Sequence, residues 1–424
     1  MNRTVSGCAI MLLVDRLTEI VAQSYETDAG LLAALRTSWP PREAAAAGGP
    51  GPDGYRPVDL GALEPAGAVR LTDRFAVAMA GEPGGSLAVA PITRDGTDWR
   101  RAVPGDGLSA FVAGVPIASE RPVGVDQTHE SIVVGERAIV KWFRRAGPQP
   151  SRAATLLAHL AAVGFDGIPA HLGSIAWRSP AGSELTLAQG DAFLPGARDG
   201  WEWCVERAPD DPSIGHELGD LVRRMHAALA EPSPVIVEPR AAGAPVDIAR
   251  WRRAALATLA EAIELTADPR LRAWEPAMRA AIEAPSTVGG VDVQPVHGDL
   301  HVGQVLDWSG GLAVIDFDGN PTLGPDANAL RQPRERDIAQ MLSSLDHVGR
   351  VVEARRGAGD AVGGWIRAAR DGFLEAVGPC DERLVDAFEV EQECRELVYA
   401  ARFLPRWRYA PMGSLRARFA TADG

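Results

Sequence analysis

The strongest constraint on the fold is a pair of short motifs in the second half of the chain. Residues 297–304 read HGDLHVGQ, and residues 312–319 read LAVIDFDG. Asp299 precedes Gln304 with the spacing D-x4-Q, and the later apolar run ends at Asp316. This order is typical of phosphoryl transfer, in which one aspartate orients and deprotonates a hydroxyl while other side-chain oxygens hold magnesium. We predict Asp299 as the catalytic base and Gln304, Asp316 and Asp318 as magnesium ligands.

The segment between the two motifs supports this interpretation. Residues 309–311 read Ser-Gly-Gly, which is typical of a tight turn between two short strands. A hairpin of this kind would bring Gln304 and Asp316 to one metal ion.

One residue stands out for its rarity. The chain carries 43 lysine and arginine residues, and Lys141 is the only lysine among them. A compact ammonium fits between phosphate oxygens where a planar guanidinium does not. Lys141 ends the apolar run 137–141 (RAIVK), which is like the V-A-I-K strand of kinases. We expect Lys141 and Ser131, on the two strands of a predicted hairpin, to bind ATP. A Walker A loop is excluded because tryptophan follows the lysine.

Sequence patterning predicts three regions. Residues 1–110 form a strand-rich cap, residues 111–192 contain the hairpin and a helix near 151–163, and residues 193–424 are mostly helical. Apolar side chains recur at helical spacing over 218–229 and 248–259.

Composition excludes several classes of protein. The net charge of −13 argues against a nucleic-acid partner, and no apolar stretch approaches the roughly 20 residues that a membrane span needs. The four cysteines lack the spacing of a zinc site or a disulfide framework. We expect a cytoplasmic monomer that binds a small sugar and ATP, with no nucleic-acid or membrane partner.

Further motifs resemble a known family. Residues 297–304, 316–321 (DFDGNP), 336–342 (RDIAQML) and 405–407 (PRW), with Gly200-Trp201, are similar to the maltokinase branch of the aminoglycoside-phosphotransferase-like kinases. The resemblance covers roughly residues 120–412. It implies an α+β, bilobal, protein-kinase-like fold with an N-terminal strand-rich cap and a mostly helical C-terminal lobe. It also implies ATP and magnesium as cosubstrates and a sugar as acceptor.

Two departures from that branch matter, the first for the lysine and the second for the substrate. No acidic residue stands between Glu136 and Asp166, so the lysine lacks its usual glutamate partner. Asp318 and Asn320 stand where maltokinases tend to carry glutamate. The pattern is more similar to the actinobacterial glucosamine kinases, which implies phosphorylation of the 6-hydroxyl of glucosamine. Maltokinase and aminoglycoside-type phosphotransferase activities stay open.

An acidic helix face near the end of the chain fits an amino sugar. Glu389, Gln392, Glu393 and Glu396 recur at i, i+3, i+4 and i+7. Like charges at this spacing disfavour an isolated helix, so we expect a cation to face them. We predict that Glu393 and Glu396 bind the substrate ammonium.

Other partners for that face also stay open. Arg395, Arg402 or solvent could interact with these carboxylates instead of an ammonium. A neutral disaccharide would favour aromatic platforms, for which the candidates are Trp201, Trp203, Trp407 and Tyr409.

The remaining candidates surround the first motif. We expect His301 to contact the phosphoryl group or the acceptor, and His297 to brace the loop from within. Asp337 is predicted as a first-turn acid or N-cap of a helix and as a substrate contact. The spacing of His297, Asp299 and His301 leaves a metallohydrolase open, and the missing glutamate leaves a nucleotide-binding pseudokinase open.

Overall fold

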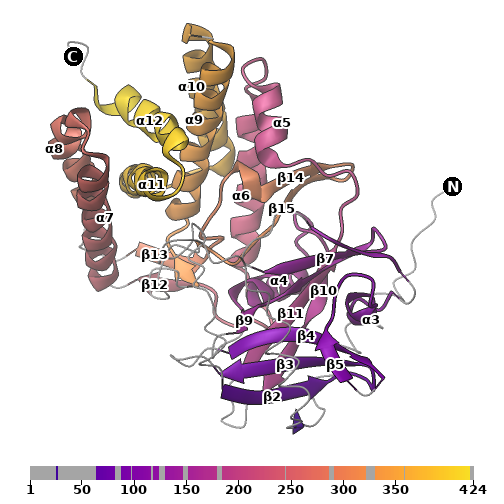
Figure 1. The fold of residues 1–424 in the computed structure, drawn as a ribbon. Helices are drawn as coiled ribbons and strands as arrows, with labels where there is room; N and C mark the ends of the chain where they lie inside the picture. The colour runs from indigo at the N-terminus through magenta and orange to yellow at the C-terminus, as the bar shows by residue number, and fades with distance from the viewer. Residues whose placement is uncertain are drawn as a thin grey trace. The chain divides into compact units, whose positions relative to one another are not determined.

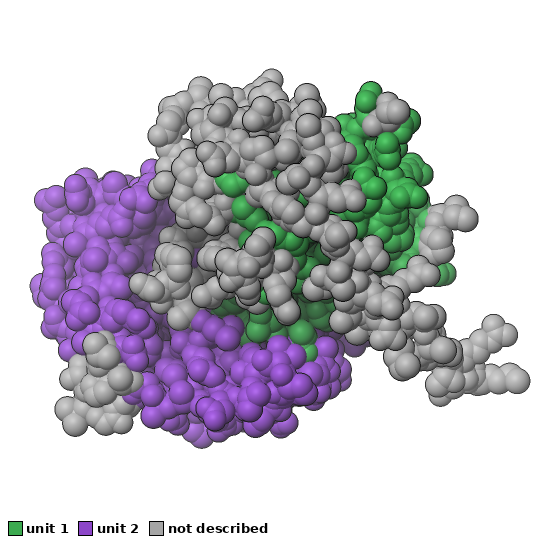
Figure 2. Space-filling model, turned by 90° about the horizontal axis from the view of Figure 1, so that it is seen from below, with its two compact units in different colours: residues 1–158, 169–195 green, residues 159–168, 196–424 purple. Residues whose placement is uncertain are grey.

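The computed structural model describes most of the chain from residue 64 onward. The described residues are 25–26, 64–81, 87–96, 98–115, 118–123, 129–146, 151–178, 184–243, 245–285, 291–320, 330–357 and 359–420. The chain forms two compact units, which are coloured separately in Figure 2. One contains residues 1–158 and 169–195, and the other contains residues 159–168 and 196–424.

The first unit is built on two antiparallel sheets (Figure 1). One sheet has the order β1-β2-β3-β4-β5, with β9 also paired to β4. Its strands are β1 (Tyr25–Glu26), β2 (Glu64–Arg70), β3 (Phe75–Gly81), β4 (Leu87–Asp95), β5 (Asp98–Arg101) and β9 (Arg145–Ala146). The other sheet has the order β10-β11-β8-β7-β6. Its strands are β6 (Glu120–Pro122), β7 (Glu130–Val134), β8 (Ala138–Trp142), β10 (His171–Arg178) and β11 (Glu184–Ala192).

One hydrophobic core serves both sheets of the first unit. Buried side chains of β3, such as Val77 and Met79, belong to the same cluster as Val140 and Trp142 of β8. The short helix α3 (Leu108–Val112) joins this core, and the indole N–H of Trp142 donates to Ser109 Oγ at 3.0 Å. The buried tryptophan thus keeps its polar atom satisfied.

The predicted hairpin and helix of the first unit are confirmed. Strands β7 and β8 pair with Ser131 opposite Lys141, and β11 places Gln189 on the other side of Lys141. Helix α4 (Arg152–Ala162) follows where residues 151–163 predict it.

The second unit is mostly helical. Its long helices are α5 (Gly200–Arg207), α6 (Ser213–Leu229), α7 (Pro245–Thr266), α8 (Pro269–Glu283), α9 (Glu335–Arg356), α10 (Gly359–Val377), α11 (Glu382–Arg402) and α12 (Tyr409–Phe419). Aspartate caps define several starts: Asp199, Asp268 and Asp381 accept backbone N–H groups in the first turns of α5, α8 and α11. Helix α9 ends at Gly357, which adopts φ 66°.

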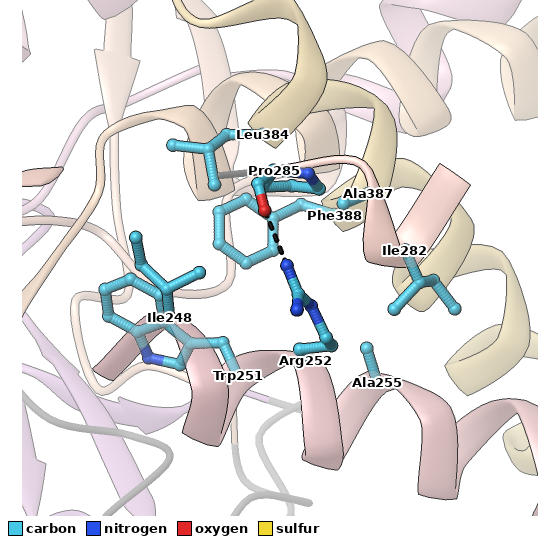
Figure 3. Close-up of a pocket in the computed structure, with 9 residues that line it drawn as sticks. All are labelled: Ile248, Trp251, Arg252, Ala255, Ile282, Pro285, Leu384, Ala387 and Phe388. Atoms are coloured by element: carbon cyan, nitrogen blue, oxygen red, sulfur yellow. Dashed lines mark hydrogen bonds between the residues drawn. The ribbon is translucent and has the colours of Figure 1, made fainter. Parts of the chain in front are cut away.

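Helix α11 is central to this helical unit. It packs against α7, α8, α9 and α12, and Figure 1 shows it end-on between them. Where α7, α8 and α11 meet, Trp251, Ile282 and Phe388 line a cavity of about 20 Å³ (Figure 3). Arg252 points into it and donates to the carbonyl of Pro285. This cavity has room for about one water molecule, so it is not a substrate site.

Short strands inside the helical unit flank the first motif. The predicted hairpin is confirmed as β14 (Val305–Trp308) and β15 (Gly311–Val314). It follows the 3-10 turn η1 (Val302–Gln304). A further sheet, β12-β13-β16, was not expected, and it contains β12 (Ala241–Gly243), β13 (Val291–Pro295) and β16 (Arg331–Gln332). Strand β13 leads into His297, so the sheet anchors the start of the loop.

The predicted class, a strand-rich first part and a mostly helical second part, is confirmed. The division at residues 110 and 192 stays a prediction, and most of residues 1–63 lie outside the described part. Among the described residues, no helix is both long enough and apolar enough to span a membrane.

Candidate active site

The loop 297–304 is fixed by hydrogen bonds from helix α9. The carboxylate of Asp337 accepts the backbone N–H groups of His297 and Gly298, both at 2.8 Å. It also accepts from Nε2 of His226 at 3.0 Å, and its side chain is 0% exposed. Asp337 lies in the first turn of α9, as predicted. Because Asp337 is buried, it is not exposed for the substrate contact that the sequence indicates. It supports the loop from the side of α9 instead.

Two further side chains of α9 continue this support. Gln340 accepts the N–H of Leu300 at 3.1 Å and donates to the carbonyl of Gly298 at 3.2 Å. Ser344 Oγ accepts the N–H of Val302 at 2.9 Å. Polar side chains of one rigid helix therefore satisfy the backbone of a buried loop, which holds it in one conformation.

His297 braces the loop from within, as predicted. Its Nε2 donates to the carbonyl of Ile315 at 2.9 Å, and its Nδ1 accepts the N–H of Asp299 at 3.3 Å. A carbonyl can only accept and an amide N–H can only donate, so these contacts fix the neutral tautomer. Both ring nitrogens are occupied, which removes His297 as a metal ligand.

Asp299 lies where several predicted site residues converge. Asn320 Nδ2 donates to Asp299 Oδ1 at 2.8 Å. Desolvation by burial raises the pKa of Asp299; the charge of His301 opposes this, and the carboxylates of Asp316 and Glu396 add to it. The structure therefore brings His301, Asp316 and Glu396 within electrostatic range of Asp299. Sequence reasoning missed the contact from Asn320, because nothing in the second motif marks its amide as a partner of the first.

The hairpin places the backbone of Gln304 beside that of Asp316. The carbonyl of Gln304 accepts the N–H of Ile315 at 2.9 Å, and Asp316 is the next residue after Ile315. Asp316 adopts φ 62°, in the left-handed region that few side chains tolerate. Such backbone is maintained at functional sites by its surroundings. Amide and carboxylate oxygens suit magnesium, and Asp318 follows two residues later, half-buried.

The carboxylates of α11 have partners on neighbouring helices. Glu389 pairs with Arg370 at 2.7 Å, and Glu393 accepts from His347 Nε2 at 2.8 Å. Burial alone would lower the pKa of His347, but Glu393, Glu396 and Asp346 raise it to about 9. A basic group does face this side of α11, and in the case of Glu393 it is the imidazole of His347.

Glu396 differs from the other carboxylates of α11 because its partners are neutral. The indole N–H of Trp407 donates to its Oε2 at 2.8 Å, and Gln392 donates to its Oε1 at 3.0 Å. Glu396 is half-buried. Each carboxylate oxygen can accept more than one hydrogen bond, so Glu396 retains capacity for a cationic donor.

Two alternatives left open by the sequence are excluded in this region. Arg395 pairs with Glu391 and Arg402 pairs with Glu261, so neither contacts Glu393 or Glu396. Trp203 is no aromatic platform, because it is fully buried and donates to the carbonyl of Val305. Each of these three side chains contacts other groups and not the carboxylates of Glu393 and Glu396.

The other aromatic candidates form a continuous group. Trp407 packs edge-on against Trp201, with ring centroids 5.7 Å apart, and against His347 at 5.5 Å. Trp201 lies 6.4 Å from the ring of His301. His301 accepts the N–H of Gly303 through Nδ1 at 3.1 Å, which turns its Nε2 away from the loop backbone.

Gly200 explains why α5 can approach the loop. A Cβ on Gly200 would lie 1.6 Å from the carbonyl oxygen of Val302, which is a severe clash. Only glycine fits at this position. This contact places Trp201, the next residue, against His301. The Gly200-Trp201 pair therefore contributes to the loop position.

Lys141 and Ser131, the predicted nucleotide-binding residues, lie in the first unit. They are register partners on β8 and β7, so their side chains share one face of the sheet. Ser131 is buried and Lys141 is half-buried. The described structure thus places the two side by side.

Comparison with known proteins gives a consistent result. Residues 120–367 match the phosphotransferase enzyme family. A glucosamine kinase of Streptacidiphilus jiangxiensis is 36% identical over 408 residues, covering 84% of this chain and 89% of the relative. A glucosamine kinase of Mycolicibacterium smegmatis (strain ATCC 700084 / mc(2)155) is 34% identical over 369 residues, covering 78% and 92%. A solved structure of a glucosamine kinase in complex with glucosamine, ADP and inorganic phosphate superposes with a TM-score of 0.73 at 32% identity, covering 94% and 98%.

Proposed function

Because this chain belongs to the phosphotransferase enzyme family, we propose that it transfers the γ-phosphoryl group of ATP to glucosamine, giving glucosamine 6-phosphate and ADP. The predicted α+β kinase-like fold is confirmed by its similarity to a glucosamine kinase structure. The curated relatives are glucosamine kinases and give no support to a maltokinase activity.

The observation that carries this proposal is the convergence of Asp299 and Glu396. Asp299 comes from the loop before β14 and Glu396 comes from α11. Glu396 accepts from Trp407, Trp407 packs on Trp201, and Trp201 packs on His301 of the same loop, and Glu396 also raises the pKa of Asp299. An aminated sugar carries a hydroxyl to be deprotonated and an ammonium to be held. The two carboxylates match those two groups.

Asp299 is proposed as the general base. Asn320 holds Oδ1, which leaves Oδ2 for the sugar hydroxyl. The hydroxyl oxygen forms a bond to the γ-phosphorus, the bond to the ADP oxygen breaks, and the hydroxyl proton passes to Asp299. A pKa raised by burial makes this carboxylate a better proton acceptor.

The nucleotide is assigned to the remaining predicted residues. Gln304, Asp316 and Asp318 supply the oxygen donors that magnesium prefers, and magnesium would neutralise charge on the phosphates. Lys141 and Ser131 would bind phosphate oxygens from the face of β7 and β8 that they share.

The ammonium is assigned to Glu396. Glu396 accepts hydrogen bonds from two neutral donors, whereas Glu393 is hydrogen-bonded to His347. We propose that Glu393 acts through His347, and that His301 lies against the acceptor beside Trp201. Asp337 acts as a positioning residue for the loop, in place of the predicted substrate contact.

The geometry of the loop favours neither a metallohydrolase nor a pseudokinase. A metallohydrolase would need His297 as a ligand, but both of its ring nitrogens are occupied. A pseudokinase would be expected to lose the supported base, yet the loop carrying Asp299 is held by three side chains of α9.

The test is an ADP-release assay with ATP, magnesium and a panel of glucosamine, glucose, N-acetylglucosamine and maltose. We expect glucosamine to give the highest kcat/KM. We expect N-acetylglucosamine to be poor because it has lost the charge and gained bulk. Maltose as the best acceptor would replace this proposal with a maltokinase.

A further inference from the structure

A second, larger cavity lies in the helical unit, and it is lined by none of the residues assigned to catalysis. It measures about 370 Å³ and is lined by side chains of α8, α9 and α12. The lining includes Arg270, Arg350, Glu353, Tyr409, Met412 and Arg416. A cavity of this size is at the small end of the range for ligand sites.

The lining of the cavity is cationic on a protein of net charge −13. Three arginines and one glutamate line it. Arg270 keeps an ion pair with Asp268 at 2.9 Å, and its side chain is 56% exposed. Arg416 is exposed, and within the described part of the chain it forms no ion pair. Asp268 and Asp346 pair with Arg270 and Arg350, so Arg416 is the arginine of the lining whose charge no ion pair in the described part offsets.

The third arginine, Arg350, is held from two sides. It donates to Asp346 at 3.0 Å and to Glu353 at 3.1 Å. A Cβ on Gly413 would lie 2.8 Å from Arg350 Cδ, so the stem of Arg350 lies directly on the glycine of α12. Asp346 also accepts from Ser414 Oγ at 2.8 Å. A guanidinium held in this way is preorganised, so little freedom is lost when it binds an anion.

The rest of the lining fits a small polar body. Tyr409 is 43% exposed and offers a ring face beside the arginines, and Met412 supplies apolar contact. Arginines bind phosphate oxygens in a bidentate geometry, as they do carboxylate oxygens. A sugar ring stacks on an aromatic face, and its hydroxyls can donate to Glu353.

We propose that this cavity binds a phosphate monoester of a small sugar, with the phosphate between Arg270, Arg350 and Arg416 and the sugar toward Tyr409. Only the choice of ligand for the test rests on the proposed function, because its product is such a monoester. The site is separate from Asp299 and Glu396, which do not line it.

The test is calorimetric titration of the full-length protein with glucosamine 6-phosphate. We expect two binding sites in the unmodified protein, one at the active site and one in the cavity. The Arg416→Gln and Arg270→Gln variants should weaken one of the two by about tenfold or more. Arg367→Gln is the matched control, because Arg367 is exposed on α10 outside the cavity. Gly413→Ala, which displaces Arg350, should weaken the same site.

The outcomes separate this proposal from the proposed function. A single site that all three cavity variants leave unchanged would overturn the cavity proposal. A second site that only Glu396→Gln weakens would also overturn it. If the sugar panel shows no phosphorylation of glucosamine while an Arg416-dependent site remains, the proposed function fails and the cavity proposal stands.

Discussion

The indole N–H of Trp407 donates to Oε2 of Glu396 at 2.8 Å, joining the turn before α12 to the carboxylate that we assign to the substrate ammonium. This contact orients Glu396 without neutralising it, because an indole carries no charge. Gln392 holds the other oxygen in the same way. The arrangement orients both oxygens of Glu396 by two neutral donors.

Trp407→Phe is therefore expected to impair glucosamine binding. The variant keeps a ring against Trp201 but loses the hydrogen bond to Glu396. We expect KM for glucosamine to rise about tenfold or more with a smaller change in kcat, since a hydrogen bond to a charged group contributes about 1.5–3 kcal/mol. Steady-state kinetics measures the split. Trp365→Phe is the control, because its indole N–H donates to the carbonyl of Asp211 instead. Equal effects of the two variants would contradict the assignment.

Asp299→Asn is expected to remove the proton acceptor. An amide keeps the hydrogen bond from Asn320 but cannot take the hydroxyl proton, so kcat should fall by roughly 10² or more. ATP affinity, measured by equilibrium binding, should stay nearly unchanged. Asp292→Asn on the exposed part of β13 should be silent. Near-normal turnover in the Asp299 variant would remove it from the mechanism.

Gly200→Ala is expected to destabilise the protein and slow turnover. The added methyl group would meet the carbonyl of Val302 at 1.6 Å, so the backbone of α5 or of the loop must shift. Overpacking of this kind costs about 1–3 kcal/mol, which urea denaturation would detect. Gly364→Ala on α10 meets nothing within 4 Å and should be neutral or stabilising. The same response at both positions would contradict the close approach.

His347 predicts a pH dependence of stability. Its pKa in the folded protein is about 9, above the value near 6.5 of an unperturbed histidine. The contribution of the charged form is therefore fully present below about pH 6.5 and is lost as pH rises through about 9. The difference in Tm between the unmodified protein and His347→Gln should shrink across this window. The exposed His216→Gln is the control. A difference that stays constant with pH would contradict an ionised His347.

Local patterns predicted the parts of the site that lie close in sequence. The hairpin of β14 and β15 follows from the glycine turn, and its register brings Gln304 to Ile315 and Asp316. Helical spacing likewise placed Glu393 and Glu396 on one helix. These features depend on turn geometry and periodicity, which a short stretch of sequence contains.

The missed contacts depend on how separate helices pack. Glu393 pairs with His347, which lies on α9 and carries no motif of its own. Arg395 was a candidate partner for the acidic face, but it turns to Glu391, which Arg336 also contacts in the buried core. The rotation of α11 against α9 decides these pairs, and periodicity within one helix does not determine it.

The central claim is that Glu396 binds the ammonium of the acceptor while Asp299 accepts the proton of its hydroxyl. The most direct test is the ratio of kcat/KM for glucosamine to that for glucose in the unmodified protein and in Glu396→Gln. Glu382→Gln, exposed in the first turn of α11, is the control. We predict that the ratio falls about tenfold or more in Glu396→Gln alone, because a charge-assisted hydrogen bond is lost for one sugar only. An unchanged ratio, with both sugars affected equally or not at all, would contradict the claim.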